Sequence, residues 1–211
     1  MRFFALLAVL LTVSPAFAAP ADMDDRVAGL REKLAEIRYA MTDEDVQLRT
    51  LDILNGQAEK LAADFPGKAE PLIVEAAIHA TRAELVGGPS ALGDAKQARD
   101  LAQAAEKIQP GVLGGTAQAI MGALYHAVPG WPISFGDDDK ARKLLRSAHA
   151  IDPANINTDY YLADYLHDKG EDAEARALLD QALNTLHGQP QTATRDGKIA
   201  AFEKLRGKLS D

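Results

Sequence analysis

The sequence predicts an all-α protein in which helical hairpins stack side by side, as in an α-solenoid, with a capping helix at the C-terminal end. Two observations carry this prediction. Apolar residues recur at three- and four-residue intervals along almost the whole chain, whereas period-two alternation over a strand length is missing. Helix-ending prolines also recur, at Pro66, Pro110 and Pro153, which are 44 and 43 residues apart.

The first four helices are expected over residues 24–40, 42–65, 70–86 and 91–109. Thr42, with Asp45 three residues later, resembles a capping arrangement that opens the second of them. Pro66-Gly67, Gly87-Gly88-Pro89 and Pro110-Gly111 end the last three. The stripes expected to face inward are Val27, Leu30, Leu34 and Ile37; Leu51, Leu54, Ala58, Leu61 and Phe65; Val74, Ala77, Ile78 and Leu85; and Ala95, Ala98, Ala102 and Ala105.

The second half of the chain predicts five more helices. One follows Gly114-Gly115, carries Ile120, Leu124 and Val128, and runs into the loop 129–136, which is the least generic stretch of the sequence. The next three are expected over 137–151, 157–168 and 171–186. After a polar connector over 188–194, the last helix carries Ile199, Phe202, Leu205 and Leu209, and its many charged residues suit a terminal cap.

The N-terminal residues 1–18 have the pattern of a cleaved signal peptide. Arg2 precedes the apolar run 3–13, and Ala16-Phe17-Ala18 has the small-x-small form of a signal-peptidase site. The apolar run is shorter than the roughly 20 residues of a membrane-spanning helix, and no later segment reaches that length without charges. We therefore expect export to the periplasm, cleavage after Ala18 and no transmembrane segment.

The mature chain, residues 19–211, has a size typical of a single domain. It contains no cysteine, so neither a disulfide nor a lipid-modified cysteine is available. Removing Arg2 takes the formal net charge from −8 to −9, which argues against nucleic acid or an anionic membrane as the main partner. A cationic partner is weakly preferred, and no cofactor is expected.

An internal repeat supports the stacked hairpins. Ala141, Leu145 and Ala148 each have an identical residue 34 positions later, at Ala175, Leu179 and Ala182. This spacing is the period of tetratricopeptide repeats, in which small residues lie where two helices cross and large ones fill the adjacent groove. The alternative is an irregular helical bundle with a chance match.

The segment from Trp131 to Asp137, with Lys140-Ala141, Ile151-Asp152-Pro153 and Asp159-Tyr160-Tyr161, resembles small exported tetratricopeptide-like proteins of Gram-negative bacteria. Among these it is similar to the TatT family, the periplasmic T-component of TRAP transporters. The likeness covers residues 115–186 and is architectural before that. It implies pairing with a periplasmic solute-binding protein. Family members can be lipid-anchored, and the missing cysteine departs from that pattern.

Candidate partner-binding residues are polar side chains on the first helix of each hairpin, because these helices line the concave face of a solenoid. They are Asn157, Tyr160, Asp164 and His167 at helical spacing, the stripe Glu75, His79 and Arg82, and His126 near the end of its helix. The alternative for each is an ordinary solvated helix face.

Two aromatic residues of the loop, Trp131 and Phe135, are candidate anchors for a partner, since exposed aromatics dominate binding energy at interfaces. Alternatively, they fill the gap between adjacent repeats. The acidic run 137–139 resembles a metal site, but its place at a helix start favours interaction with the helix dipole.

An enzyme is the less favoured function. No serine of the mature chain lies in Gly-x-Ser-x-Gly, no His-Glu-x-x-His exists, and the glycine pairs match no phosphate-binding pattern. A metal held between His79 and His126 is the remaining enzymatic alternative. The sequence thus predicts a non-enzymatic scaffold that binds a protein partner in its concave groove. The first alternative is an accessory component of a TRAP-type uptake system, and the oligomeric state stays open.

Overall fold

The computed structural model describes residues 20–209, so the predicted signal peptide and its cleavage site lie outside the described residues. Within the described range the structure consists of helices, short connections and one longer loop over 128–137. The elements are α1 (Pro20–Ala40), α2 (Glu44–Asp64), α3 (Ala69–Val86), the 3-10 turn η1 (Pro89–Ala91), α4 (Leu92–Ile108), α5 (Val112–Ala127), α6 (Asp138–Ile151), α7 (Ile156–Asp168), α8 (Asp172–His187) and α9 (Ala193–Arg206).

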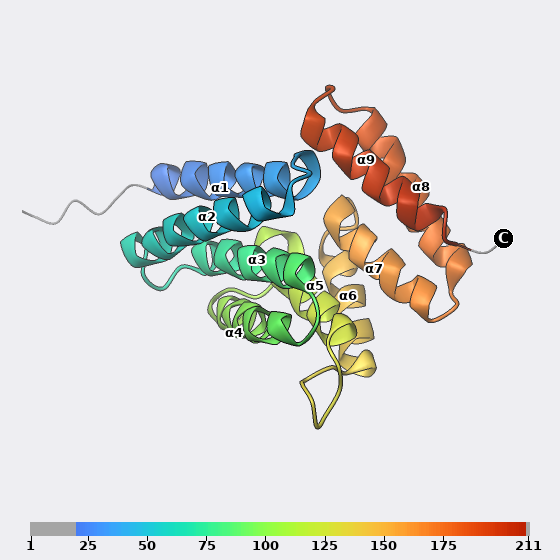
Figure 1. Cartoon of the computed structure of the whole chain (residues 1–211), viewed down its shortest axis with the longest axis horizontal. Helices are drawn as coiled ribbons and strands as arrows, with labels where there is room; N and C mark the ends of the chain where they lie inside the picture. The colour runs from blue at the N-terminus through green and yellow to red at the C-terminus, as the bar shows by residue number, and fades with distance from the viewer. Residues whose placement is uncertain (1–19, 210–211) are drawn as a thin grey trace, which may run out of the picture.

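Consecutive helices pair as four hairpins, α1/α2, α3/α4, α5/α6 and α7/α8, and α9 follows the last pair (Figure 1). Each hairpin packs on the next one along the chain, through α2 on α3, α4 on α5 and α6 on α7. The predicted helical-repeat solenoid with a C-terminal helix is therefore confirmed. The apolar stripes and the repeat pairs named from the sequence together supply most of the buried core.

The predicted repeat pairs occupy equivalent places in the second helices of the last two hairpins. Ala141, Leu145 and Ala148 of α6, and Ala175, Leu179 and Ala182 of α8, all have 0% of their surface exposed. The alanines leave room for the neighbouring helices to approach, and the leucines fill the space beside them. The four alanines of α4 are buried in the same way, against α3 and α5.

Several predicted helix boundaries need correction. Asp43, and not Thr42, caps α2, because its carboxylate accepts the Val46 N–H at 2.9 Å. The last helix begins within the predicted connector, where the Thr192 hydroxyl accepts the Arg195 N–H at 3.1 Å. Both segments offer more than one polar residue, and the one whose side chain reaches the free N–H groups becomes the cap.

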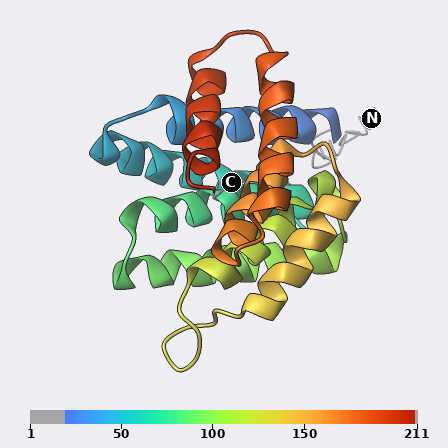
Figure 2. The ribbon, with the colours of Figure 1, turned by 90° about the vertical axis from the view of Figure 1, so that its right-hand side faces the viewer.

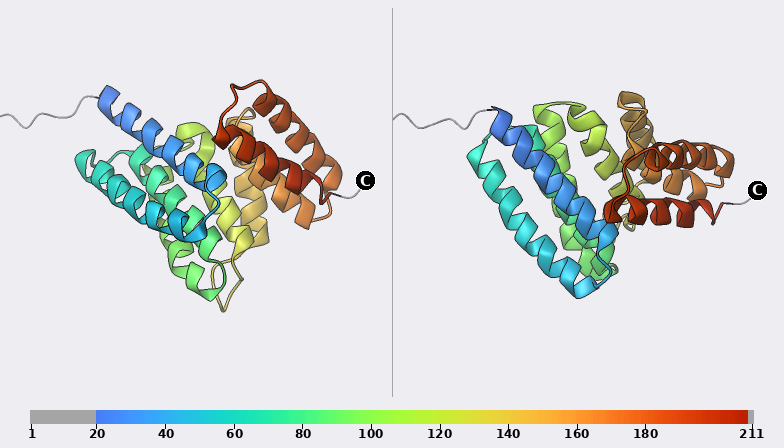
Figure 3. Two further views of the ribbon diagram at one scale, coloured as in Figure 1. Left: turned by 45° about the horizontal axis from the view of Figure 1, so that its top comes forward. Right: turned by 90° about the horizontal axis from the view of Figure 1, so that it is seen from above.

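The stack is curved so strongly that its two ends meet. The last helix, α9, packs on α8 and also on α1, so the end of the first helix meets the beginning of the last (Figures 2 and 3). The inner face of the solenoid is thereby enclosed between the N-terminal and C-terminal hairpins. Among the described helices, none is both long enough and apolar enough to cross a membrane.

Candidate functional site

The enclosed inner face contains two adjoining cavities. The first, which we call the apolar chamber, has a volume of about 770 Å³ and lies between α3, η1, α4, α5 and α7. The second, the polar chamber, has a volume of about 560 Å³ and lies between α1, α3, α5, α7 and α9. The first helix of every hairpin contributes to them, whereas α2, α6 and α8 line neither.

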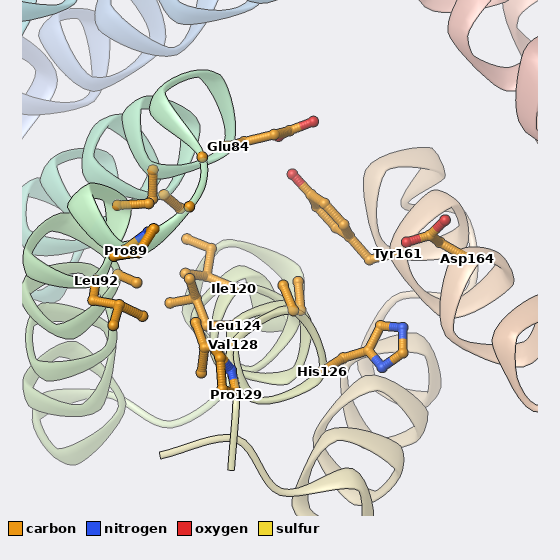
Figure 4. Close-up of a pocket in the computed structure, with 18 of the residues that line it drawn as sticks. Glu84, Pro89, Leu92, Ile120, Leu124, His126, Val128, Pro129, Tyr161 and Asp164 are labelled. Carbon is orange, nitrogen blue, oxygen red and sulfur yellow. The ribbon is translucent and has the colours of Figure 1, made fainter. Parts of the chain in front are cut away.

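One wall of the apolar chamber consists of aliphatic side chains. They come from the end of α3, from η1 and α4, and from one face of α5, which continues into Pro129 of the loop (Figure 4). This wall includes Ala80, Pro89, Leu92, Ile120, Leu124 and Val128. Such a surface gives apolar groups of a ligand a place away from water.

The opposite wall is polar and is formed by Tyr160, Tyr161 and Asp164 of α7 together with His126 of α5 (Figure 4). Burial raises the pKa of Asp164 above its usual value, and nearby Asp168 adds to this shift. Burial also raises the pKa of Tyr160 to about 12. Both groups are therefore biased toward their neutral forms.

His126 is held in place by contacts on both sides of its ring. Its Nε2 lies 3.0 Å from a carboxylate oxygen of Asp168, and its Nδ1 lies 3.6 Å from Asp138. The ring also packs edge-on against Tyr165, with 5.1 Å between the ring centroids. His126 thus closes one side of the chamber as a fixed polar group.

Arg38 lies between the two chambers and links three helices. Its guanidinium donates to the Tyr161 hydroxyl of α7 and lies 2.7 Å from the Glu84 carboxylate of α3. Although burial opposes its charge, Tyr161, Tyr39 and Glu84 together keep the pKa of Arg38 above its ordinary value. A charged side chain at the centre of the inner face is therefore already neutralised by the protein.

Four of the predicted site residues do lie on the inner face. Tyr160, Asp164 and His126 line the apolar chamber, and Asn157 lines the polar chamber. His167, predicted beside them, lies outside both chambers, where its Nδ1 is 2.7 Å from Asp172 at the start of α8. The predicted stripe on α7 therefore lies on the inner face at Asn157, Tyr160 and Asp164 but not at His167.

The stripe of Glu75, His79 and Arg82 lies outside both chambers. Glu75 and His79 are buried, and His79 contacts Asp94 of α4 at 2.8 Å. Arg82 donates to Asp52 of α2 at 2.8 Å. The expectation that these residues line the groove is wrong, because α3 is covered by α2 on one side and α4 on the other. The contact of His79 stays within its own hairpin, whereas that of Arg82 joins the hairpin to the preceding one.

The two loop aromatics have different environments. Phe135 packs into the core, edge-on to Tyr125 at a centroid distance of 5.4 Å, with the Arg99 guanidinium 4.3 Å above its ring. It fills the gap between repeats, as the alternative interpretation stated. Trp131, by contrast, has 89% of its surface exposed.

Sequence reasoning missed Arg38, Tyr161 and Lys198, which are charged and aromatic groups of the inner face. Arg38 and Lys198 occupy helix positions that are typical of a solvated surface. Tyr161 is adjacent to the predicted Tyr160, and the pair of tyrosines was the available signal.

A metal site is not formed by the residues considered for one. His79 and His126 bind separate carboxylates in different hairpins, and the described residues 20–209 contain no group of three or more potential metal ligands. In the acidic run, the Asp137 carboxylate accepts the Lys140 N–H at 3.0 Å and caps α6.

Comparisons with known proteins agree with this architecture. A family model described as tetratricopeptide repeat matches residues 133–194, which span α6, α7 and α8. The chain is tetratricopeptide-like. A crystal structure of a thermophilic tetratricopeptide-repeat protein of Thermus thermophilus shares the fold, with a TM-score of 0.54 and 18% identity over 87% of this chain and 92% of that one. No curated protein sequence matches.

Tetratricopeptide-like folds are in general scaffolds for protein interaction and not enzymes. In this tetratricopeptide-like chain the matched region contains the internal repeat and the polar wall formed by α7. The match therefore includes the part of the inner face that α7 contributes.

Proposed function

We propose that this chain is a periplasmic tetratricopeptide-like scaffold that binds a protein partner noncovalently through its concave groove. The periplasmic location is supported by the signal-peptide pattern of residues 1–18. The observation that carries the binding role is Trp131, a large apolar side chain with 89% of its surface exposed, in a loop whose Pro129 and Ile133 line the apolar chamber. Exposed aromatics of this kind are common anchors at interfaces.

The loop that presents Trp131 is braced along its length. The N–H groups of Ile133 and Ser134 donate to the Gly130 carbonyl at 3.1 and 3.2 Å, and the Gly136 N–H donates to the Pro129 carbonyl at 2.9 Å. Gly136 has no room for a side chain, since a Cβ there would lie 2.0 Å from the Val128 oxygen. The loop backbone that carries Trp131 is therefore held in place, which lowers the entropy cost of binding.

Exposed Ile133 extends this apolar surface toward the groove. It is 67% exposed, and it also lines the apolar chamber. A partner that contacts Trp131 can therefore continue across Ile133 into the groove. Because α9 packs on α1 and encloses the inner face, a protruding segment of the partner fits better than a folded domain.

A second candidate function is an accessory component of a TRAP-type uptake system that pairs with a solute-binding protein. The volumes of the two chambers favour it, since both lie in the range of small-molecule sites, about 300–1,000 Å³. On this proposal the chain would contact the solute as well as the protein that carries it.

Capture from periplasmic extract tests the proposed function. The tagged full chain, Trp131→Ala and the control Ile53→Ala, which removes an exposed apolar side chain from α2, are compared. We expect Trp131→Ala to lose at least tenfold of a copurifying protein while keeping its melting temperature, and Ile53→Ala to retain that protein. Equal recovery by all three proteins would contradict the role of Trp131. Recovery of a solute-binding protein would favour the second candidate.

A further inference from the structure

We infer that the two chambers form one binding site for an amphipathic carboxylate, with its carboxylate beside Lys198 and Arg31 and its apolar body in the apolar chamber. This inference rests on the proposed binding role of the inner face, and it adds the chemical class of a ligand. It is carried by an uncompensated cation, by the charges around that cation and by the continuity of the two chambers.

Lys198 of α9 is a half-buried cation without an anionic partner. Among residues 20–209, no carboxylate lies within salt-bridge distance of its ammonium group, which instead lies 5.4 Å from the centre of the Tyr39 ring. Burial, and then Arg38 and Arg31, lower the pKa of Lys198. A bound anion would offset all three effects, so the site favours negative charge.

The other cations of the polar chamber are divided into two kinds. Arg38 is paired with Glu84 at 2.7 Å, and Arg195 is paired with Asp196 at 2.8 Å. Arg31, like Lys198, has no carboxylate within salt-bridge distance in the described part of the chain. Its presence makes the chamber a local cationic site in a protein with a formal net charge of −8.

The net charge of the residues that line the polar chamber favours one class of anion over another. Glu32 also lines the polar chamber, so Lys198 and Arg31 leave an excess of a single positive charge. A carboxylate carries one negative charge, whereas a phosphate monoester carries about 1.5 to 2 at neutral pH. The balance therefore favours a carboxylate over a phosphate.

The apolar body of the ligand has a chamber directly beyond this site. Arg38, Ala80, Ile120 and Tyr161 line both chambers, so the two cavities meet at these residues. In the apolar chamber the carboxyl group on the polar wall is Asp164, whose pKa is raised by burial, so burial there disfavours a negative charge. The orientation is thus fixed: the carboxylate lies toward α9 and the apolar chain toward η1 and α4.

The test is a titration of the purified full chain, by calorimetry, with hexanoate, octanoate and decanoate. Decanol and decyl phosphate are titrated as matched probes of the head group. We expect saturable binding that tightens about fourfold with each added methylene, because each buried methylene contributes a constant increment. Decanol and decyl phosphate should both bind at least tenfold more weakly than decanoate. Equal or tighter binding of decyl phosphate would overturn the carboxylate assignment.

Two lysines of the same helix provide the variant and its control. Lys198→Met keeps the aliphatic stem and removes the charge, and it should weaken decanoate binding about tenfold without changing decanol binding. Lys204→Met, which changes an exposed lysine outside both chambers, should bind decanoate as the parent does. Equal affinities of the two variants would overturn the inference. If Lys198→Met does not fold, the exposed Arg31→Met tests the same charge and should lower decanoate affinity in the same direction.

The apolar chamber is tested separately with Ala123→Phe, which places a ring in it from α5. This variant should lose decanoate and decanol together. An absence of saturable decanoate binding by the parent protein would overturn this inference, while capture of a partner through Trp131 would still support the proposed function. Conversely, decanoate binding without any Trp131-dependent partner would leave the inference standing and contradict the proposed function.

Discussion

Gly197 of α9 lies directly against the main chain of Tyr39 in α1. A Cβ at Gly197 would come within 1.8 Å of the Tyr39 carbonyl oxygen and 2.7 Å of its carbonyl carbon. Backbone therefore contacts backbone where the last helix crosses the first, and the missing side chain permits that approach. The enclosure of the inner face depends on this crossing.

Replacing Gly197 by alanine should separate these two helices. Glycine to alanine inside a helix ordinarily stabilises a protein by about 0.5–1 kcal/mol. Here the new methyl group meets main-chain atoms that have no flexible end to move aside, so we expect a loss of about 1–3 kcal/mol in the free energy of unfolding. Urea denaturation measures it. Gly29→Ala in α1, where a Cβ meets nothing within 4 Å, is the matched control and should stabilise.

Because α6 and α8 are equivalent helices of the repeat, the same substitution should destabilise the protein at the matching position of each. Ala148→Arg and Ala182→Arg should each lower the free energy of unfolding by at least about 3 kcal/mol, because each forces a large unpaired charge into a closed helix crossing. Ala150→Arg, at an exposed position of α6, should change stability little. Unchanged thermal unfolding of either crossing variant would show that the equivalence of α6 and α8 is wrong.

The contact between Arg38 and Tyr161 should be measurable as a coupling energy. The guanidinium donates to the phenol oxygen across the inner face, between α1 and α7. A double-mutant cycle with Arg38→Met and Tyr161→Phe should give a coupling of about 1.5–3 kcal/mol, the usual value for hydrogen bonds to charged groups. Chemical denaturation of the four proteins supplies the numbers. A coupling near zero would mean that the two side chains do not interact in solution.

Stability should depend on pH through Asp164. Its folded-state pKa is raised above that of the unfolded chain, so the folded state holds the proton more tightly. Between the unfolded and folded pKa values, stability therefore falls as the pH rises, and the loss is complete above the folded pKa. Asp164→Asn should be more stable than the parent at neutral pH, with a difference that vanishes below about pH 3.9. A difference that is constant across this range would contradict the role of burial at Asp164.

Sequence periodicity predicted the helices because each one buries a stripe of regular spacing. The stripe Leu51, Leu54, Ala58 and Leu61 is buried as expected, and the 34-residue pairs occupy equivalent crossings. These features depend on contacts between neighbours in the chain, which a local pattern encodes. The capping residues Asp43 and Thr192 were missed by one or two positions, since several polar residues near a helix start can cap it.

The inner face was harder to predict, because it depends on curvature that accumulates over the whole stack. Glu75 and His79 form a polar stripe opposite an apolar one, which indicates a solvated face, yet both are buried, and His79 contacts Asp94 of the adjacent α4. Arg38 and Lys198 resemble surface residues until α9 returns to α1. No local spacing encodes a meeting between residues about 160 positions apart.

The meeting of α1 and α9 also limits how the molecule can grow and unfold. An open solenoid can accept another repeat at either end, and its stability is approximately a sum over neighbouring units. Here the first and last helices contact each other, so a hairpin added at that junction would have to replace this contact. Loss of an inner hairpin would break two interfaces between hairpins and also separate α9 from α1, and this couples distant hairpins into a single cooperative transition.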